Sequence, residues 1–164
     1  MSITEQIIGK KTKIMKVVIQ RVSEASVTIN KKIVASIDNG MLVLLGIVEE
    51  DTQEDINWLC SKLIGLRIFP DENMVMNKSI QDTKGNVIVV SQFTLHASTR
   101  KGNRPSYIKA AKPHVAIPLY ENFIATLQNN LGQSVQSGEF GADMKVKLLN
   151  DGPVTIIIDS KEKV

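Results

Sequence analysis

The stretch Val87-Ile88-Val89-Val90-Ser91-Gln92-Phe93-Thr94-Leu95 decides the fold of this chain. It begins with four branched apolar residues, the pattern of a strand that is buried on both faces. It then changes to Ser-Gln-Phe-Thr, so two hydroxyls and an amide stand where the buried strand ends. Polar groups in such a place need hydrogen-bond partners. The partners are either neighbouring groups of the chain or a ligand, and the residues alone leave both possibilities open.

Strand patterns lie on both sides of this stretch. Further strands are expected at 16–22, 25–29, 33–37, 41–48, 66–69, 135–138, 144–149 and 154–159. Apolar residues at helical spacing predict two substantial helices between them, one after residue 51 and one over 115–131 with Pro118 in its first turn. Helices that interrupt a mostly hairpin-linked order of strands favour an α+β fold over a doubly wound parallel sheet.

The first helix has two possible starts and contains the single cysteine. Asp51 with Glu54, or Thr52 with Asp55, resembles a capping box. Cys60 lies within the apolar stripe of this helix, which predicts core packing, since a reactive thiol needs exposure and a lowered pKa.

Composition sets limits on the class of protein. A chain of 164 residues with 43% hydrophobic residues is long enough for one domain with a true core. No apolar run has the length that a membrane span needs, and one cysteine allows no internal disulfide, which fits a reducing compartment. We therefore expect a cytoplasmic protein. Residues 1–14 hold three lysines in their last five positions and predict a flexible extension before a domain over 15–164.

Few residues have the pattern of a catalytic or metal site. The chain has two histidines, and no two candidate ligands have the spacing of a zinc site, so we expect neither a metal nor a cofactor. A Walker loop, a dinucleotide fingerprint and a nucleophile elbow are all missing from the sequence. His96 is the nearer histidine to the polar strand end and is a candidate general base, whereas His114 fits a surface position.

Two further segments have unusual composition. Residues 96–106 contain Arg100, Lys101 and Arg104 and no acid, which suits a nucleic-acid backbone, although a solvated surface loop is the commoner use of such a segment. Gly152-Pro153 lies between two expected strands and predicts a turn. A proline also permits a cis peptide bond, which would point two neighbouring carbonyls the same way, and the sequence leaves the isomer open.

Several segments together resemble the D-aminoacyl-tRNA deacylases, the D-tyrosyl-tRNA(Tyr) deacylase family. They are Ser91–Leu95, Lys101–Ser106, Gly138–Met144 and Asn150–Thr155, with Gln20–Val22 at the start, and the resemblance covers about residues 15–160. It implies a barrel-like, mostly antiparallel sheet with two main helices in a homodimer with its active sites at the interface. It also implies hydrolysis of the ester between a D-amino acid and the 3′-terminal adenosine of tRNA, as chiral proofreading in translation, and clearance of mischarged glycine from tRNA(Ala).

The resemblance also implies roles for individual residues. Ser91, Gln92, Phe93 and Thr94 would surround the scissile ester, with the backbone N–H of Phe93 as oxyanion donor. The attack on the ester is open between two groups, the hydroxyl of Thr94 and a water assisted by the 2′-hydroxyl of the terminal ribose, and we favour the second. The loop residues Arg100, Lys101 and Arg104 would bind tRNA.

The same family pattern implies a cis Gly152–Pro153 peptide that enters the site of the partner subunit. Its carbonyls would hold the α-amino group of the substrate, and an L side chain would collide with it. Arg21 would brace this segment, and Ala116 would offer a backbone carbonyl. Two alternatives stay open: a related editing deacylase with a trans Gly-Pro peptide, and a tRNA-binding module without catalysis.

Overall fold

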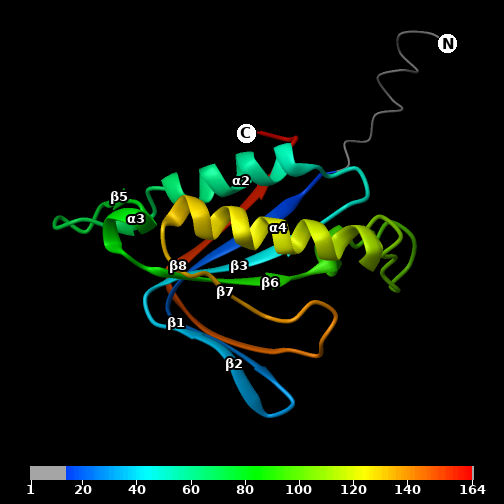
Figure 1. Cartoon of the computed structure of the whole chain (residues 1–164), viewed down its shortest axis with the longest axis horizontal. Coiled ribbons are helices and arrows are strands. Elements are labelled where there is room, and N and C mark those ends of the chain that lie inside the picture. Colours follow the sequence, from blue (N-terminus) through cyan, green and yellow to red (C-terminus); the bar gives the residue numbers. More distant parts are fainter. Residues whose placement is uncertain (1–13, 164) are drawn as a thin grey trace, which may run out of the picture.

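Two long helices cover one face of a strongly curved sheet. The structure, a computed structural model, describes residues 14–163. Its elements in chain order are β1 (Lys16–Ile29), β2 (Lys32–Ile37), β3 (Gly40–Gly46), α2 (Gln53–Gly65), β4 (Phe69–Pro70), β5 (Met76–Lys78), α3 (Ile80–Thr83), β6 (Asn86–Ser91), the 3-10 turn η1 (Phe93–His96), α4 (Pro113–Leu131), β7 (Gln136–Ser137) and β8 (Lys145–Asp159). Helices α2 and α4 lie side by side above the sheet, and the hairpin of β1 and β2 lies at the end of the sheet farthest from them (Figure 1). The predicted α+β class is confirmed.

Strand β1 is the centre of the sheet. It pairs antiparallel with β3 through residues 16–22, with β2 through residues 25–29, and with β8 along most of its length. Beyond β3 the pairing becomes parallel, from β3 to β6 and from β6 to β7. The sheet is therefore mixed. Gly40 makes the close approach of β3 to β6 possible, because a Cβ there would lie 1.8 Å from the carbonyl oxygen of Asn86.

One side chain almost closes the sheet into a barrel. The carboxamide of Gln136 in β7 donates to the carbonyl of Ser36 in β2 and accepts from its N–H, each at 2.7 Å. These are the bonds that a neighbouring strand would make. The predicted barrel-like architecture is confirmed, and its seam between β2 and β7 is held by a side chain.

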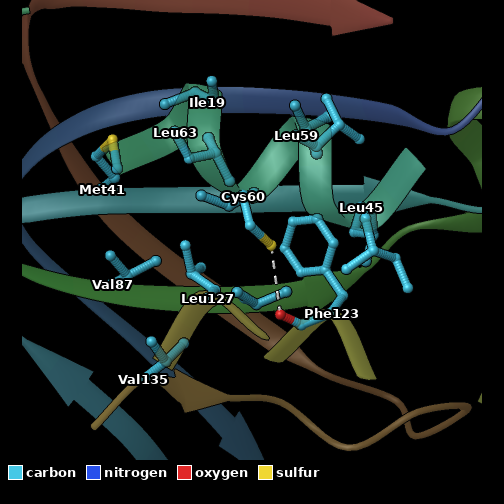
Figure 2. Close-up of a cluster of buried hydrophobic side chains, with 14 of the residues drawn as sticks. Ile19, Met41, Leu45, Leu59, Cys60, Leu63, Val87, Phe123, Leu127 and Val135 are labelled. Carbon is cyan, nitrogen blue, oxygen red and sulfur yellow. Dashed lines mark hydrogen bonds between the residues drawn. The ribbon is translucent and has the colours of Figure 1, made fainter. Parts of the chain in front are cut away.

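The main core lies between the helices and the sheet. Figure 2 shows Cys60 and Leu63 of α2 and Phe123 of α4 directed at side chains of β1, β3 and β6. The thiol of Cys60 donates to the carbonyl of Phe123 at 3.6 Å, and burial raises the pKa of the thiol to about 12. The predicted core position of Cys60 is confirmed. Helix α2 begins with the second of the two expected caps, since the carboxylate of Asp55 accepts from the N–H of Thr52 at 2.9 Å.

Several predicted boundaries are wrong for local physical reasons. The buried strand that opens the stretch 87–95 does end where its polar residues begin, at Ser91, and the chain then turns into η1. The second helix begins two residues early, at Pro113, which places Pro118 in its interior. The strands expected at 144–149 and 154–159 form one strand, β8, because both halves pair with β1. Residues 151–154, which contain Gly152 and Pro153, therefore bulge out from within one strand, and we call this segment the excursion.

The predicted N-terminal extension falls almost wholly on residues 1–13, which lie outside the described residues. Ile14, the last residue assigned to it, is buried. Among residues 14–163, no helix combines the length and the apolar character that crossing a membrane requires.

Candidate active site

The polar end of β6 begins the candidate site. Ser91 is the last residue of the strand, and the N–H of Gln92 still bonds to the carbonyl of Leu45 in β3 at 2.8 Å. The chain then turns into η1, and the side-chain amide of Gln92 donates to the hydroxyl oxygen of Thr94. Two of the polar groups that the sequence singled out therefore satisfy each other. The hydroxyl oxygen of Thr94 is already engaged as an acceptor.

Phe93 occupies the first position of η1. The first N–H groups of a helical turn have no partner within the turn, so the backbone of Phe93 is suited to donate to a ligand. Its side chain is 53% exposed and packs edge to face on Tyr107, with ring centroids 5.1 Å apart. Phe93 and Tyr107 together form an exposed aromatic surface beside the end of β6.

A cavity of about 260 Å³ opens beside these residues. One wall is the end of β6 and the start of η1, and the other is the loop that precedes β8. The lining residues are Val90, Ser91, Gln92, Phe93, Phe140, Gly141, Ala142, Asp143, Met144 and Val146. Asp143 is the one acid or base in this lining. It is exposed, and Lys145 binds its carboxylate at 3.2 Å.

Tyr120 of α4 holds the two walls of the cavity together. Its buried hydroxyl lies within hydrogen-bond distance of the carbonyls of Gly138, at 3.0 Å, and Val89, at 3.3 Å. The N–H of Gly138 bonds to the same Val89 carbonyl at 3.1 Å. The Tyr120 ring also packs on Phe140, with centroids 5.8 Å apart. This junction fixes the cavity loop against the strand that leads into Ser91.

The candidate general base His96 lies outside the cavity lining. It is the last residue of η1 and only 9% exposed, and its ring packs where a side chain on Gly46 would otherwise stand. Burial lowers the pKa of His96 below its ordinary value. The imidazole is therefore neutral at pH 7, but it packs inside the protein rather than beside Ser91–Thr94.

The Gly152-Pro153 segment leaves the sheet opposite Arg21. Gln20 pairs with Thr155 and Val22 with Asn150, so residues 151–154 bulge out opposite one residue of β1. Gly152 has a φ of +144°, which favours glycine, and the Gly152–Pro153 peptide bond is cis. Both residues are exposed.

Two side chains hold this excursion in place. The guanidinium of Arg21, 9% exposed, donates through Nε to the carbonyl of Asp151 at 2.8 Å and through Nη1 to the carbonyl of Ile68 at 2.6 Å. The carboxamide of Asn150 accepts from the N–H of Val154 at 2.8 Å and donates to its carbonyl at 3.2 Å. Arg21 therefore contacts the segment that contains Gly152 and Pro153 through the carbonyl of Asp151.

The excursion and the cavity lie far apart within one chain. Arg21 pairs with Met41 of β3, whereas Ser91 pairs with Leu45, so the two places differ by four residues along the strands, about 13 Å. Strands β1 and β3 also lie between β8 and β6, which adds about 14 Å across the sheet. The structure therefore does not bring Gly152 and Pro153 to Ser91–Thr94 of the same chain.

The basic loop leaves η1 beside the cavity. Residues Ser98 and Ser106 pair through two backbone hydrogen bonds of 2.8 and 2.9 Å, which close the segment between them. Arg100, Lys101 and Arg104 lie on that segment and are exposed. Ala116 is buried in the first turns of α4, where its side chain packs in the main core.

Sequence reasoning missed three residues that shape the site. Tyr120 lies within the helix predicted over 115–131, and it could have been found, because a buried tyrosine hydroxyl needs a hydrogen-bond partner. Asn150 gave no such signal. The side chain of Met144 fills the space where a Cβ on Gly138 would lie, 2.3 Å from its sulfur, a contact that no local pattern encodes.

Comparisons with known proteins agree with the geometry. The sequence model of the family described as D-Tyr-tRNA(Tyr) deacylase matches residues 18–159. The D-aminoacyl-tRNA deacylases of Flavobacterium psychrophilum and Christiangramia forsetii are 68% and 67% identical over 149 residues, which is 91% of this chain and 99% of each relative.

Two solved structures share the fold. One, described as c-Myc DNA Unwinding Element Binding Protein, is 39% identical, with a TM-score of 0.82 over 88% of this chain and 97% of that one. A probable eukaryotic D-amino acid tRNA deacylase is 18% identical, with a TM-score of 0.79 over 89% of this chain and 99% of that one. The second likeness concerns the fold alone.

The Tyr120 junction leads to a stability prediction. Tyr120→Phe removes the hydroxyl donor that lies between the carbonyls of Gly138 and Val89, so the free energy of unfolding should fall by about 1–2 kcal/mol. Hydrogen exchange at the amide of Gly138 should accelerate as well. The matched control is Tyr107→Phe, which keeps the ring on Phe93 at an exposed position and should change the free energy by less than about 0.5 kcal/mol in urea denaturation. Equal effects of the two variants would contradict the junction.

Proposed function

This chain belongs to the D-Tyr-tRNA(Tyr) deacylase family, and from that premise we propose that it hydrolyses the ester between a D-amino acid and the 3′-terminal adenosine of tRNA. The observation that carries the proposal is the cavity of about 260 Å³ that Phe93 lines from the first position of η1, where a backbone N–H is suited to donate to a ligand. Phe140 and Met144 offer the apolar surfaces on which an adenine base packs. In the cytoplasm, where translation occurs, this reaction is chiral proofreading.

The proposed chemistry uses backbone and substrate groups. A water oxygen attacks the ester carbonyl, the carbonyl oxygen becomes negatively charged, and the bond to the ribose O3′ then breaks as that oxygen takes a proton. The N–H of Phe93 donates to the developing oxyanion, a type of contact that contributes about 3–4 kcal/mol in well-studied hydrolases. Since this donor belongs to the backbone, no triad is needed to place it.

The 2′-hydroxyl of the terminal ribose is the group that we propose to assist the water. Among the residues that line the cavity, the one titratable side chain is Asp143, and Lys145 already binds it. His96 is buried outside the lining, and the hydroxyl oxygen of Thr94 accepts from Gln92. None of these groups is placed as a free general base.

Selection against L substrates is proposed to come from a second subunit. Gly152 and Pro153 are exposed and lie well outside the cavity of their own chain, so they are available to enter the cavity of a partner. Their carbonyls would accept from the α-amino group of the substrate, and the Phe93 N–H would hold the ester. A D side chain would then point to solvent, whereas an L side chain would meet the backbone of the segment.

The same geometry predicts two further substrate properties. Glycine has no side chain to collide, so glycyl-tRNA(Ala) would also be hydrolysed. The exposed cations Arg100, Lys101 and Arg104 begin beside the rim of the cavity and would bind the tRNA backbone. We further propose that the carbonyl of Ala116 contributes to the site from the first turns of α4.

A chirality assay tests the proposed function directly. We expect the protein to release D-tyrosine from D-tyrosyl-tRNA at least about a hundredfold faster than L-tyrosine from the L form, because steric exclusion of a wrong group discriminates strongly. Release of both at similar rates would contradict the exclusion by Gly152–Pro153. Binding of tRNA with release of neither would favour a binding module without catalysis.

The source of the attacking group makes a separate prediction. Thr94→Ala should retain deacylation within about tenfold, whereas a D-aminoacyl-tRNA that ends in 2′-deoxyadenosine should lose about a hundredfold or more, the usual contribution of a positioned proton-transfer group. Single-turnover rates separate this chemistry from tRNA binding. The reverse pattern would make the Thr94 hydroxyl the nucleophile. Ser98→Ala, outside the cavity lining, is the matched hydroxyl control.

A further inference from the structure

An apolar tip stands at one end of the molecule. The hairpin of β4 and β5 ends in residues 71–76, the hairpin tip, where Met74, Val75 and Met76 are 81%, 57% and 55% exposed. Three neighbouring apolar side chains in solvent mark an interaction surface, because removing their apolar surface from water on binding is favourable.

The hairpin tip is rigidly built. The carboxylate of Asp71 accepts from the N–H groups of Asn73 at 2.8 Å and Val75 at 3.1 Å, and the N–H of Asp71 bonds to the carbonyl of Val75 at 2.8 Å. Arg67 donates to Asn77 at the base of the hairpin. A surface that is ordered before binding loses little conformational entropy when it docks.

A second exposed apolar surface borders the cavity. Ile108 is 91% exposed and follows Tyr107, which is 39% exposed and packs on Phe93. We name these three residues the rim ridge. It is ordered as well, since the N–H of Ala110 bonds to the carbonyl of Tyr107 at 3.0 Å and that of Ala111 to the carbonyl of Ile47 at 2.9 Å.

The hairpin tip and the rim ridge belong to opposite ends of the sheet. The hairpin begins just after Ile68, whose carbonyl accepts a hydrogen bond from Arg21 of β1. Arg21 in turn pairs with Met41 of β3, so the hairpin lies at the Met41 end of the sheet. The rim ridge is anchored at Ile47, six residues further along the chain, or about 20 Å in an extended strand. Figure 1 shows the hairpin at β5 far from the loop that leads into α4. One chain cannot bring the two surfaces together.

A second copy of the chain can do so. Arg21 donates hydrogen bonds both to Ile68, at the base of the β4–β5 hairpin, and to Asp151 of the excursion, so these two segments lie at the same end of the chain. Phe93 belongs to the rim ridge and also lines the cavity, so those two lie together at the other end. In a twofold pair that places Gly152 of one copy in the cavity of the other, the hairpin tip would lie on the side of one copy that faces the rim ridge of its partner.

Charge favours the same pairing. The hairpin tip holds Asp71 and Glu72, of which Glu72 is paired with Lys78 of β5 at 2.7 Å, whereas residues 97–112 hold five lysines and arginines and no acid. An acidic apolar tip suits a basic apolar ridge. It does not suit the phosphates of RNA, which repel carboxylates.

We propose that the hairpin tip of one subunit docks on the rim ridge of its partner, with Met74 against Ile108, at the mouth of the active site. This proposal rests on the proposed function, in which two subunits together form each active site. It adds a second contact surface between those subunits. The partner is a second copy of this chain, and its tip would cover the side of the cavity from which solvent enters.

Cysteine pairing tests this contact. Two differently tagged chains, one with Met74→Cys and one with Ile108→Cys, are co-expressed, purified through both tags and oxidised. The native Cys60 is buried and inert under these conditions. We expect a covalent dimer on a non-reducing gel, lost on reduction. The matched control pairs Ile108→Cys with Val34→Cys, a half-exposed residue of β2, and should give no covalent dimer.

Sedimentation and the chirality assay on the same proteins separate the possible failures. A dimer that hydrolyses D-aminoacyl-tRNA but forms no covalent bond between positions 74 and 108 would overturn this contact and leave the proposed function standing. A monomer in solution would overturn both this contact and the shared site. Equal bond formation in the control pair would also overturn the contact, because it would show random collision.

Discussion

The guanidinium of Arg21 is the interaction on which the proposed shared site depends. A buried cation is costly unless its hydrogen bonds are satisfied, and this one is satisfied by the carbonyls of Asp151 and Ile68. Those two carbonyls belong to segments that would otherwise be independent, the excursion from β8 and the base of the β4–β5 hairpin. One side chain therefore sets the direction in which Gly152-Pro153 and the hairpin tip leave the molecule.

At the other end of the sheet, a second set of contacts fixes the cavity. Tyr120 joins the carbonyls of Val89 and Gly138, and Phe93 is the first residue of η1, where an N–H has no acceptor within the turn. The parallel pairing of β3 with β6 carries the rigid core up to Ser91. Each chain thus holds a cavity at one end and a projecting segment at the other, a distribution that suits an isologous dimer with two composite sites.

Much of the architecture followed from the sequence. The branched run at 87–90 and the stripe through Cys60 were correctly assigned to the core, because burial leaves a periodic signal. The Gly152-Pro153 stretch was taken for a turn between strands, because glycine and proline usually mark turns. Only pairing with β1 reveals one strand with an excursion, and pairing is not a local property. The same holds for Gln136 at the barrel seam, whose partner Ser36 is 100 residues away.

The candidate site divides in the same way. The chain's own polar groups at 91–94 could be located from sequence, and the family resemblance supplied roles that no pattern shows. The spatial arrangement of these groups could not be predicted. Both the Gln92–Thr94 hydrogen bond and the distance between the excursion and the cavity depend on how the sheet folds. Tyr120 could have been found, because a tyrosine in an apolar helix face predicts a buried hydroxyl with a partner.

Subunit complementation tests most directly whether two chains share each site. Ala142→Trp fills the cavity of its own chain, and Gly152→Val disrupts the segment proposed to enter the cavity of the partner. Each variant alone should be nearly inactive as a homodimer. A mixed dimer purified through two different tags has one intact site of two, so it should recover about half of the wild-type rate of D-tyrosyl-tRNA hydrolysis. A mixed dimer no more active than the two homodimers would contradict the shared site.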